Sequence, residues 1–72
     1  MSHWNYRVMK RRNGLGGYEY GIYEVYYDDN GNIEGWTEDP MTPTGSSEDD
    51  LRDELEIMKA AFNNETLIYK ED

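Results

Sequence analysis

The stretch YYDDNGNIEGW, which begins at Tyr26, comes nearer to a metal-binding motif than any other part of the chain. An EF-hand calcium loop needs oxygen ligands at its first, third, fifth and twelfth positions around a central glycine. When the stretch is aligned on Gly31, Asp28 and Asn30 fall on the third and fifth positions. Tyr26 and Thr37 occupy the first and twelfth positions and supply no carboxylate. The sequence therefore predicts no calcium site in this loop.

The same residues suit the turn of a β-hairpin. Asp28 is favoured at the first position of a type I turn, and Gly31 can take the left-handed bulge conformation that follows. A two-residue turn at Asn30 and Gly31 is the alternative. A shift of one residue moves the next strand to the other face of the sheet, so the turn decides the register. The bulged turn pairs Tyr27 with Ile33 and Val25 with Gly35, whereas the tight turn pairs Val25 with Trp36.

Elsewhere the chain lacks the residue sets that catalysis and metal binding need. It has no cysteine, and its one histidine, His3, stands near an end of the chain, where backbones fray. Zinc ligation and the Ser-His-Asp and Cys-His arrangements are therefore not expected. The stretch NGLGG at 13–17 does not have the spacing of a phosphate-binding loop. We expect no catalytic, cofactor or metal site, and a protein that is not an enzyme.

Length and charge limit the class of protein further. The 72 residues predict one small domain, residues 1–72, which buries only about 60% of its unfolded surface. The net charge is −9 and is unevenly spread. Residues 1–17 hold four basic and no acidic residues, whereas residues 18–72 hold three basic and sixteen acidic residues. Because this acidic body repels nucleic acid and anionic lipid, we expect neither as a partner.

The sequence shows no signal for membrane insertion or export. No apolar run approaches the roughly 20 residues of a membrane-spanning helix, and no signal-peptide core follows Met1. The absence of cysteine agrees with a reducing compartment. The expected location is the cytoplasm.

The residue patterns predict an α+β domain of order β-β-β-α. Alternating and β-branched or aromatic stretches predict three strands, and two prolines and a glycine then predict a loop. A three-stranded antiparallel β-meander packed by one C-terminal amphipathic helix is the simplest arrangement that buries the apolar stripe of the helix against one face of the sheet. The sequence does not decide whether residues 66–70 (TLIYK) form a short final strand. The three strands are HWNYRVMKRR from His3, YEYGIYEVYY from Tyr18 and NIEGWTE from Asn32.

The helix is the best-defined element. Ser46 and Ser47 each precede an acidic residue by three positions, which resembles a capping box, and acidic side chains fill the first turns. The asparagine pair at 63–64 can end the helix through a left-handed cap. One apolar stripe, expected to face the sheet, recurs at helical spacing: Leu51, Leu55, Met58 and Phe62.

The sheet carries more aromatic side chains than one helix can cover. In the second strand Tyr23, Val25 and Tyr27 share one face, and Tyr20, Ile22 and Tyr26 share the other. Aromatic side chains that the helix leaves uncovered are exposed, covered by the C-terminal tail or buried in a partner. The candidate partner surface is Tyr20, Tyr23, Tyr26, Tyr27 and Trp36.

Three stretches resemble a family of short, uncharacterised bacterial proteins: WNYRV, YGIYEVYYDDNGNIEGWTEDP and GSSEDDLRDELEIMKAAF. More distantly, the plan is similar to HicB-like antitoxin domains, in which a strand pair leads through a G-x-T/S-x-E-E-A/L segment into a helix. Gly45, Ser47, Glu48 and Leu51 match parts of that segment. The resemblance implies a bacterial, sheet-and-helix domain that binds a protein partner or forms a homodimer.

These observations together predict a small acidic protein-interaction module that is HicB-like in plan and is not an enzyme. The partner is another protein or a second copy of the chain. The alternative is a phage-type inhibitor, whose acidic surface mimics nucleic acid and blocks a basic nucleic-acid-handling complex.

Overall fold

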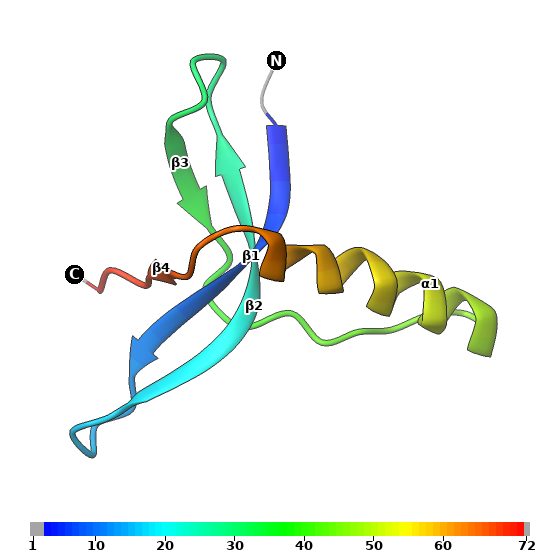
Figure 1. Cartoon of the computed structure of the whole chain (residues 1–72), viewed down its shortest axis with the longest axis horizontal. Coiled ribbons are helices and arrows are strands. Elements are labelled where there is room, and N and C mark those ends of the chain that lie inside the picture. Colours follow the sequence, from blue (N-terminus) through cyan, green and yellow to red (C-terminus); the bar gives the residue numbers. More distant parts are fainter. Residues whose placement is uncertain (1–2, 72) are drawn as a thin grey trace.

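The computed structural model describes residues 3–71. These residues form a strongly curled sheet crossed by one helix, which confirms the predicted α+β class (Figure 1). The elements are β1 (His3–Arg12), β2 (Tyr18–Tyr27), β3 (Ile33–Trp36), α1 (Glu48–Lys59), the 3-10 turn η1 (Ala60–Asn63) and β4 (Leu67–Ile68).

The sheet has four strands in the order β3-β2-β1-β4. The first three form the predicted antiparallel meander. The fourth runs parallel to β1, with Leu67 opposite Met9 and Ile68 opposite Lys10, so the sheet is mixed. This corrects the three-stranded prediction, and the short final strand considered at 66–70 forms as β4. The physical reason is that β4 pairs with backbone groups of β1 that would otherwise stand unpaired at a sheet edge.

The long β1–β2 hairpin is closed by the predicted glycine-rich turn. The Asn13 N–H donates to the Gly17 carbonyl at 3.1 Å, and Asn13 Oδ1 accepts hydrogen bonds from the N–H groups of Leu15 and Gly17. Gly14 and Gly16 have φ values of 81° and 85°, which glycine adopts without steric cost. The turn therefore holds Leu15 out at the end of the hairpin.

Asp28 organises the β2–β3 turn. Its carbonyl accepts from the Gly31 N–H at 3.0 Å, and its Oδ1 accepts from the N–H groups of Asn30 and Asn32 at 2.9 Å each. These backbone bonds, that from Asn32 foremost, lower the pKa of the Asp28 carboxyl. Gly31 has a φ of 83°. The bulged type I turn is therefore confirmed.

The register of β3 combines the two predicted alternatives. Beside the turn, Tyr27 pairs with Ile33, as the bulged turn predicts. A further irregularity between Tyr26 and Tyr27 shifts the pairing by one residue, so Val25 lies opposite Trp36. Each alternative was therefore right for one part of the strand. The shift places Trp36 against the cluster that contains Val25.

Buried side chains lie on both faces of the sheet. On one face the helix and η1 provide Met58 and Ala61, which pack against Tyr6 and Val8. On the other face the buried cluster is Met9, Tyr23 and Val25, and the C-terminal residues Leu67 and Tyr69 pack against it. The helix therefore covers one face, and the C-terminal tail covers part of the other.

Two arginines of β1 attach the tail. The Arg7 guanidinium donates to the Glu65 carbonyl at 2.8 Å. Arg11 lies 4.2 Å from the centre of the Tyr69 ring and forms an ion pair with Glu71. Part of the positive charge of the N-terminal segment thus serves to hold the acidic end of the chain.

The helix begins where the sequence predicts. Ser47 is its N-cap, and the Ser47 hydroxyl accepts a hydrogen bond from the Asp50 N–H at 3.1 Å. The end differs from the prediction, because Asn64 has an extended backbone (φ −117°, ψ 161°) instead of a left-handed one. The 3-10 turn η1 carries the chain out of the helix before Asn64, so no left-handed cap forms there.

Only the C-terminal part of α1 packs on the sheet. In Figure 1 the helix crosses β1 near that end and projects beyond the sheet at its N-terminal end. Met58 is 3% exposed, but Leu55 is 49% and Phe62 69% exposed. The prediction that the whole stripe faces the sheet is therefore wrong for Leu55 and Phe62. The helical face that packs on the sheet carries Glu54, Met58 and Ala61, and it leaves the other two side chains on its flank.

Candidate protein-interaction site

The described residues carry no arrangement that suggests metal chemistry. Within residues 3–71, no group of three or more His, Cys, Asp or Glu side chains is placed to hold a metal ion. The Asp28 carboxylate accepts hydrogen bonds from its own turn. In the same part of the chain no helix has the length and apolar character that crossing a membrane requires.

The five aromatic residues predicted as a partner surface lie on both faces of the sheet. Tyr23, Tyr27 and Trp36 belong to the cluster against which the tail packs. Tyr20 and Tyr26 lie on the helix side, where Tyr20 is 66% exposed and Tyr26 is half-buried. The structure therefore does not bring these five side chains together into one open patch.

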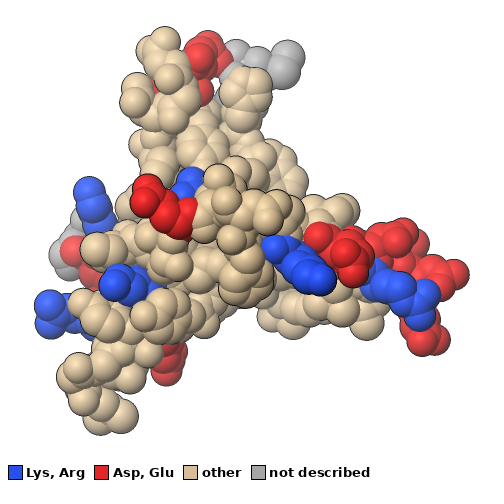
Figure 2. All heavy atoms as spheres, in the orientation of Figure 1, with Lys and Arg blue, Asp and Glu red and all other residues tan. Residues whose placement is uncertain are grey.

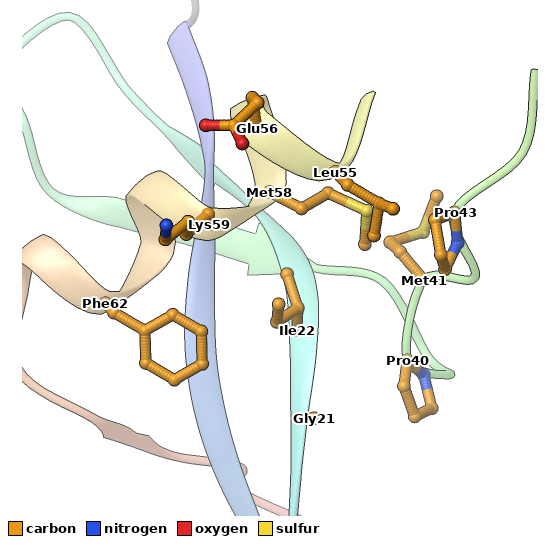
Figure 3. Close-up of a pocket in the computed structure, with 10 residues that line it drawn as sticks. All are labelled: Gly21, Ile22, Pro40, Met41, Pro43, Leu55, Glu56, Met58, Lys59 and Phe62. Atoms are coloured by element: carbon orange, nitrogen blue, oxygen red, sulfur yellow. The ribbon is translucent and has the colours of Figure 1, made fainter. Parts of the chain in front are cut away.

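A groove of about 440 Å³ runs beside α1 on the helix side of the sheet (Figure 3). The helix forms one wall, β2 contributes Gly21 and Ile22, and the segment 40–43 forms the opposite wall. In Figure 3, Leu55 and Met58 point across the groove toward Met41. Most of the lining side chains are apolar, so the groove can accept apolar side chains of a partner.

Hydrogen bonding and close packing fix the wall opposite the helix. The Met41 N–H donates to the Ile22 carbonyl at 2.7 Å, which holds the segment 40–43 against β2. Gly21 allows this approach, because a β-carbon at that position would lie 3.0 Å from Pro40 Cβ. The sequence predicts only a loop here, but these contacts make the segment a defined surface.

A partly buried hydrogen bond between β1 and α1 helps to set the position of the helix. The Tyr6 hydroxyl of β1 donates to Glu54 Oε1 of α1. This bond, followed by burial, raises the pKa of Tyr6 to about 12. Glu54 and Leu55 are neighbours, so fixing Glu54 toward the sheet holds Leu55 at the groove.

Two charged side chains of opposite sign stand at the groove, Glu56 and Lys59. Neither forms an ion pair with another residue of the range 3–71. The other basic residue of the helix, Arg52, is engaged by Glu48 at 3.7 Å and by Asp49 at 3.2 Å. Glu56 and Lys59 are therefore available for a partner.

The opposite flank of the helix is also incompletely covered. A second depression, again of about 440 Å³, lies between Trp4, Tyr6 and Ile57. Trp4 packs edge-on against Tyr6, with ring centroids 5.2 Å apart. Trp4 and Ile57 remain exposed. This flank has more polar lining residues, among them Asn63 and Asn64, so it is the weaker candidate for apolar docking.

Comparison with protein-family models, with curated proteins and with solved structures gives no match to this chain. The resemblance to short bacterial proteins and to HicB-like domains stays a prediction.

Sequence reasoning missed the groove because its walls are far apart in the chain. The sequence predicts the helical stripe, but it indicates only the sheet as the surface against which the stripe packs. One signal pointed to the groove: Met41 is a large apolar residue in a proline-flanked loop, outside any predicted strand or helix.

Proposed function

We propose that this protein is a small, acidic, non-enzymatic protein-interaction module, and that the groove beside α1 is its docking site. The observation that carries the proposal is the exposure of Leu55 in α1 and Phe62 in η1, two large apolar residues that line the groove beside the buried Met58. A large apolar side chain left in water forgoes about 1.5–3 kcal/mol of burial. Exposed apolar surface of this kind, bordered by polar residues, is typical of docking sites.

The shape of the chain supports the same proposal. Its radius of gyration is 13.3 Å, whereas a compact domain of 72 residues has about 11 Å. The projecting helix and the two long hairpin ends account for the difference (Figure 1). An extended chain of this size offers surface to a partner and buries little of it internally.

The test is binding of Nile red, an uncharged dye that fluoresces in apolar surroundings. At low protein concentration, Leu55→Ser and Phe62→Ser are expected to lower dye binding several-fold, because each removes an apolar wall of the groove. The matched control is Leu15→Ser, which removes an exposed leucine at the hairpin end, away from the groove. Circular dichroism checks that all three variants stay folded. Unchanged dye binding in both groove variants would reject the site.

A second candidate is the inhibitor that mimics nucleic acid. The observation in its favour is that acidic side chains gather toward the projecting end of the helix, at the right of Figure 2. Glu48, Asp49 and Asp50 lie in the first helical turn. The two candidates differ in their response to salt, because charge holds a mimic to its target, whereas burial of apolar surface holds a groove to its occupant.

A further inference from the structure

The groove has a charge pattern that is complementary to itself. Glu56 and Lys59 stand three residues apart on α1, which is about 4.5 Å along the helix axis. When two copies of α1 lie antiparallel, a two-fold axis between these positions brings Glu56 of each copy opposite Lys59 of the other. The same residues then form two identical ion pairs, which is the signature of an isologous contact.

The apolar residues follow the same symmetry. In this antiparallel arrangement Leu55 of one α1 lies within about one helical turn of Phe62, which is in the η1 turn that follows the other α1, and the reverse contact is identical. Both side chains lean toward the N-terminus of their own helix, which brings them closer together across the axis. Each copy therefore supplies the apolar cover that the other lacks.

The area of exposed surface agrees with the area that a second copy of the chain would bury. The chain exposes 5571 Å², whereas a compact 8.5 kDa protein exposes roughly 4,700 Å². The excess of roughly 900 Å² is close to the ~800 Å² that each partner buries in an interface of standard size. Pairing about α1 would cover both the groove and the projecting part of the helix.

We propose that the occupant of the groove is a second copy of this chain, docked with α1 antiparallel to α1 about a two-fold axis between Glu56 and Lys59. This proposal rests on the proposed function, since it names the partner of the same site. A basic peptide of another protein would leave Lys59 facing like charge, whereas the second copy satisfies both Glu56 and Lys59.

The experiment is a charge-swap series followed by sedimentation equilibrium. Glu56→Lys places two lysines opposite each other at each pair, and Lys59→Glu places two glutamates there. Each variant is expected to weaken self-association by about tenfold or more. The double variant E56K/K59E restores both pairs with exchanged signs and is expected to recover the wild-type dissociation constant.

A mixture of the two single variants is the most decisive test of the Glu56–Lys59 pairing. Glu56→Lys presents two positive residues and Lys59→Glu two negative ones, so an equimolar mixture is expected to form heterodimers more tightly than either variant self-associates. Glu34→Lys and Lys70→Glu are controls of the same charge change at exposed positions outside the groove, and both are expected to change the dissociation constant much less than the groove variants do.

Two results would overturn the proposal. One is a wild-type chain that stays monomeric at every concentration at which it is soluble. The other is a dimer that both single reversals leave unchanged. A monomer whose dye binding is nevertheless lost in Leu55→Ser rejects the second copy but keeps the groove as a docking site. Dye binding that neither groove substitution alters rejects the docking site itself.

Discussion

At the scale of single residues, one hydrogen bond that the sequence did not reveal joins the helix to the sheet. The Tyr6 hydroxyl donates to Glu54 Oε1 in a partly buried hydrogen bond, and Tyr6 as a whole is 8% exposed. Tyr6 reads in sequence as one apolar member of an alternating strand, and Glu54 as a solvated acid of the helix. The two lie 48 positions apart, so nothing local in the sequence joins them.

Tyr6→Phe is therefore expected to lower the free energy of unfolding by about 1 kcal/mol, because the Glu54 carboxylate loses its donor. The raised pKa of Tyr6 means that the folded state favours the protonated hydroxyl. Its contribution is fully present below the unfolded pKa, about 10, and is lost as pH rises through about 12. Urea unfolding at neutral pH and between these values measures both effects.

The matched control for this substitution is Tyr20→Phe, which removes a hydroxyl from an exposed side chain of β2. It should leave the free energy of unfolding unchanged. A Tyr6→Phe variant as stable as the wild type at neutral pH would contradict the role assigned to the Glu54 bond.

At the scale of elements, local patterns predicted what local forces determine. The β1–β2 and β2–β3 turns and the Ser47 cap follow from short-range hydrogen bonds and glycine conformations, and all three form as expected. The parallel pairing of β4 with β1 depends on where the chain emerges from the helix, which no short window of sequence contains. The overhang of α1 depends in turn on the length of sheet beneath it.

The approach to α1 gives an element-scale prediction. A β-carbon at Gly45 would lie 2.5 Å from the Leu51 backbone nitrogen, so Gly45→Ala must displace the start of the helix. We expect a loss of about 2 kcal/mol in the free energy of unfolding. Gly35→Ala in β3 is the control, because a β-carbon there meets nothing within 4 Å. Thermal melts compare the two, and equal melting temperatures would contradict the close contact.

At the scale of the whole molecule, the charge of the chain has two distinct uses. Arg7 and Arg11 of the basic N-terminal segment bind the C-terminal tail, so they are not a free basic patch. The remaining surface is dominated by acids, and the net charge is −9. The composition alone shows the excess of acidic residues. Only the fold shows that the two arginines bind the C-terminal tail.

This net charge makes the proposed dimer depend on salt in a defined direction. Two copies, each of charge −9, repel one another over distances comparable to their own size, 37 × 35 × 20 Å. Raising the salt concentration from about 0.01 M to about 0.1 M shortens the screening length from roughly 30 Å to roughly 10 Å. Apolar contact between the two grooves is not weakened by this change. We therefore expect the dissociation constant of the dimer, measured by sedimentation equilibrium, to fall as salt is added. A dissociation constant that rises with salt would contradict this expectation, because it would mean that screening of the Glu56–Lys59 pairs outweighs the relief of the net repulsion.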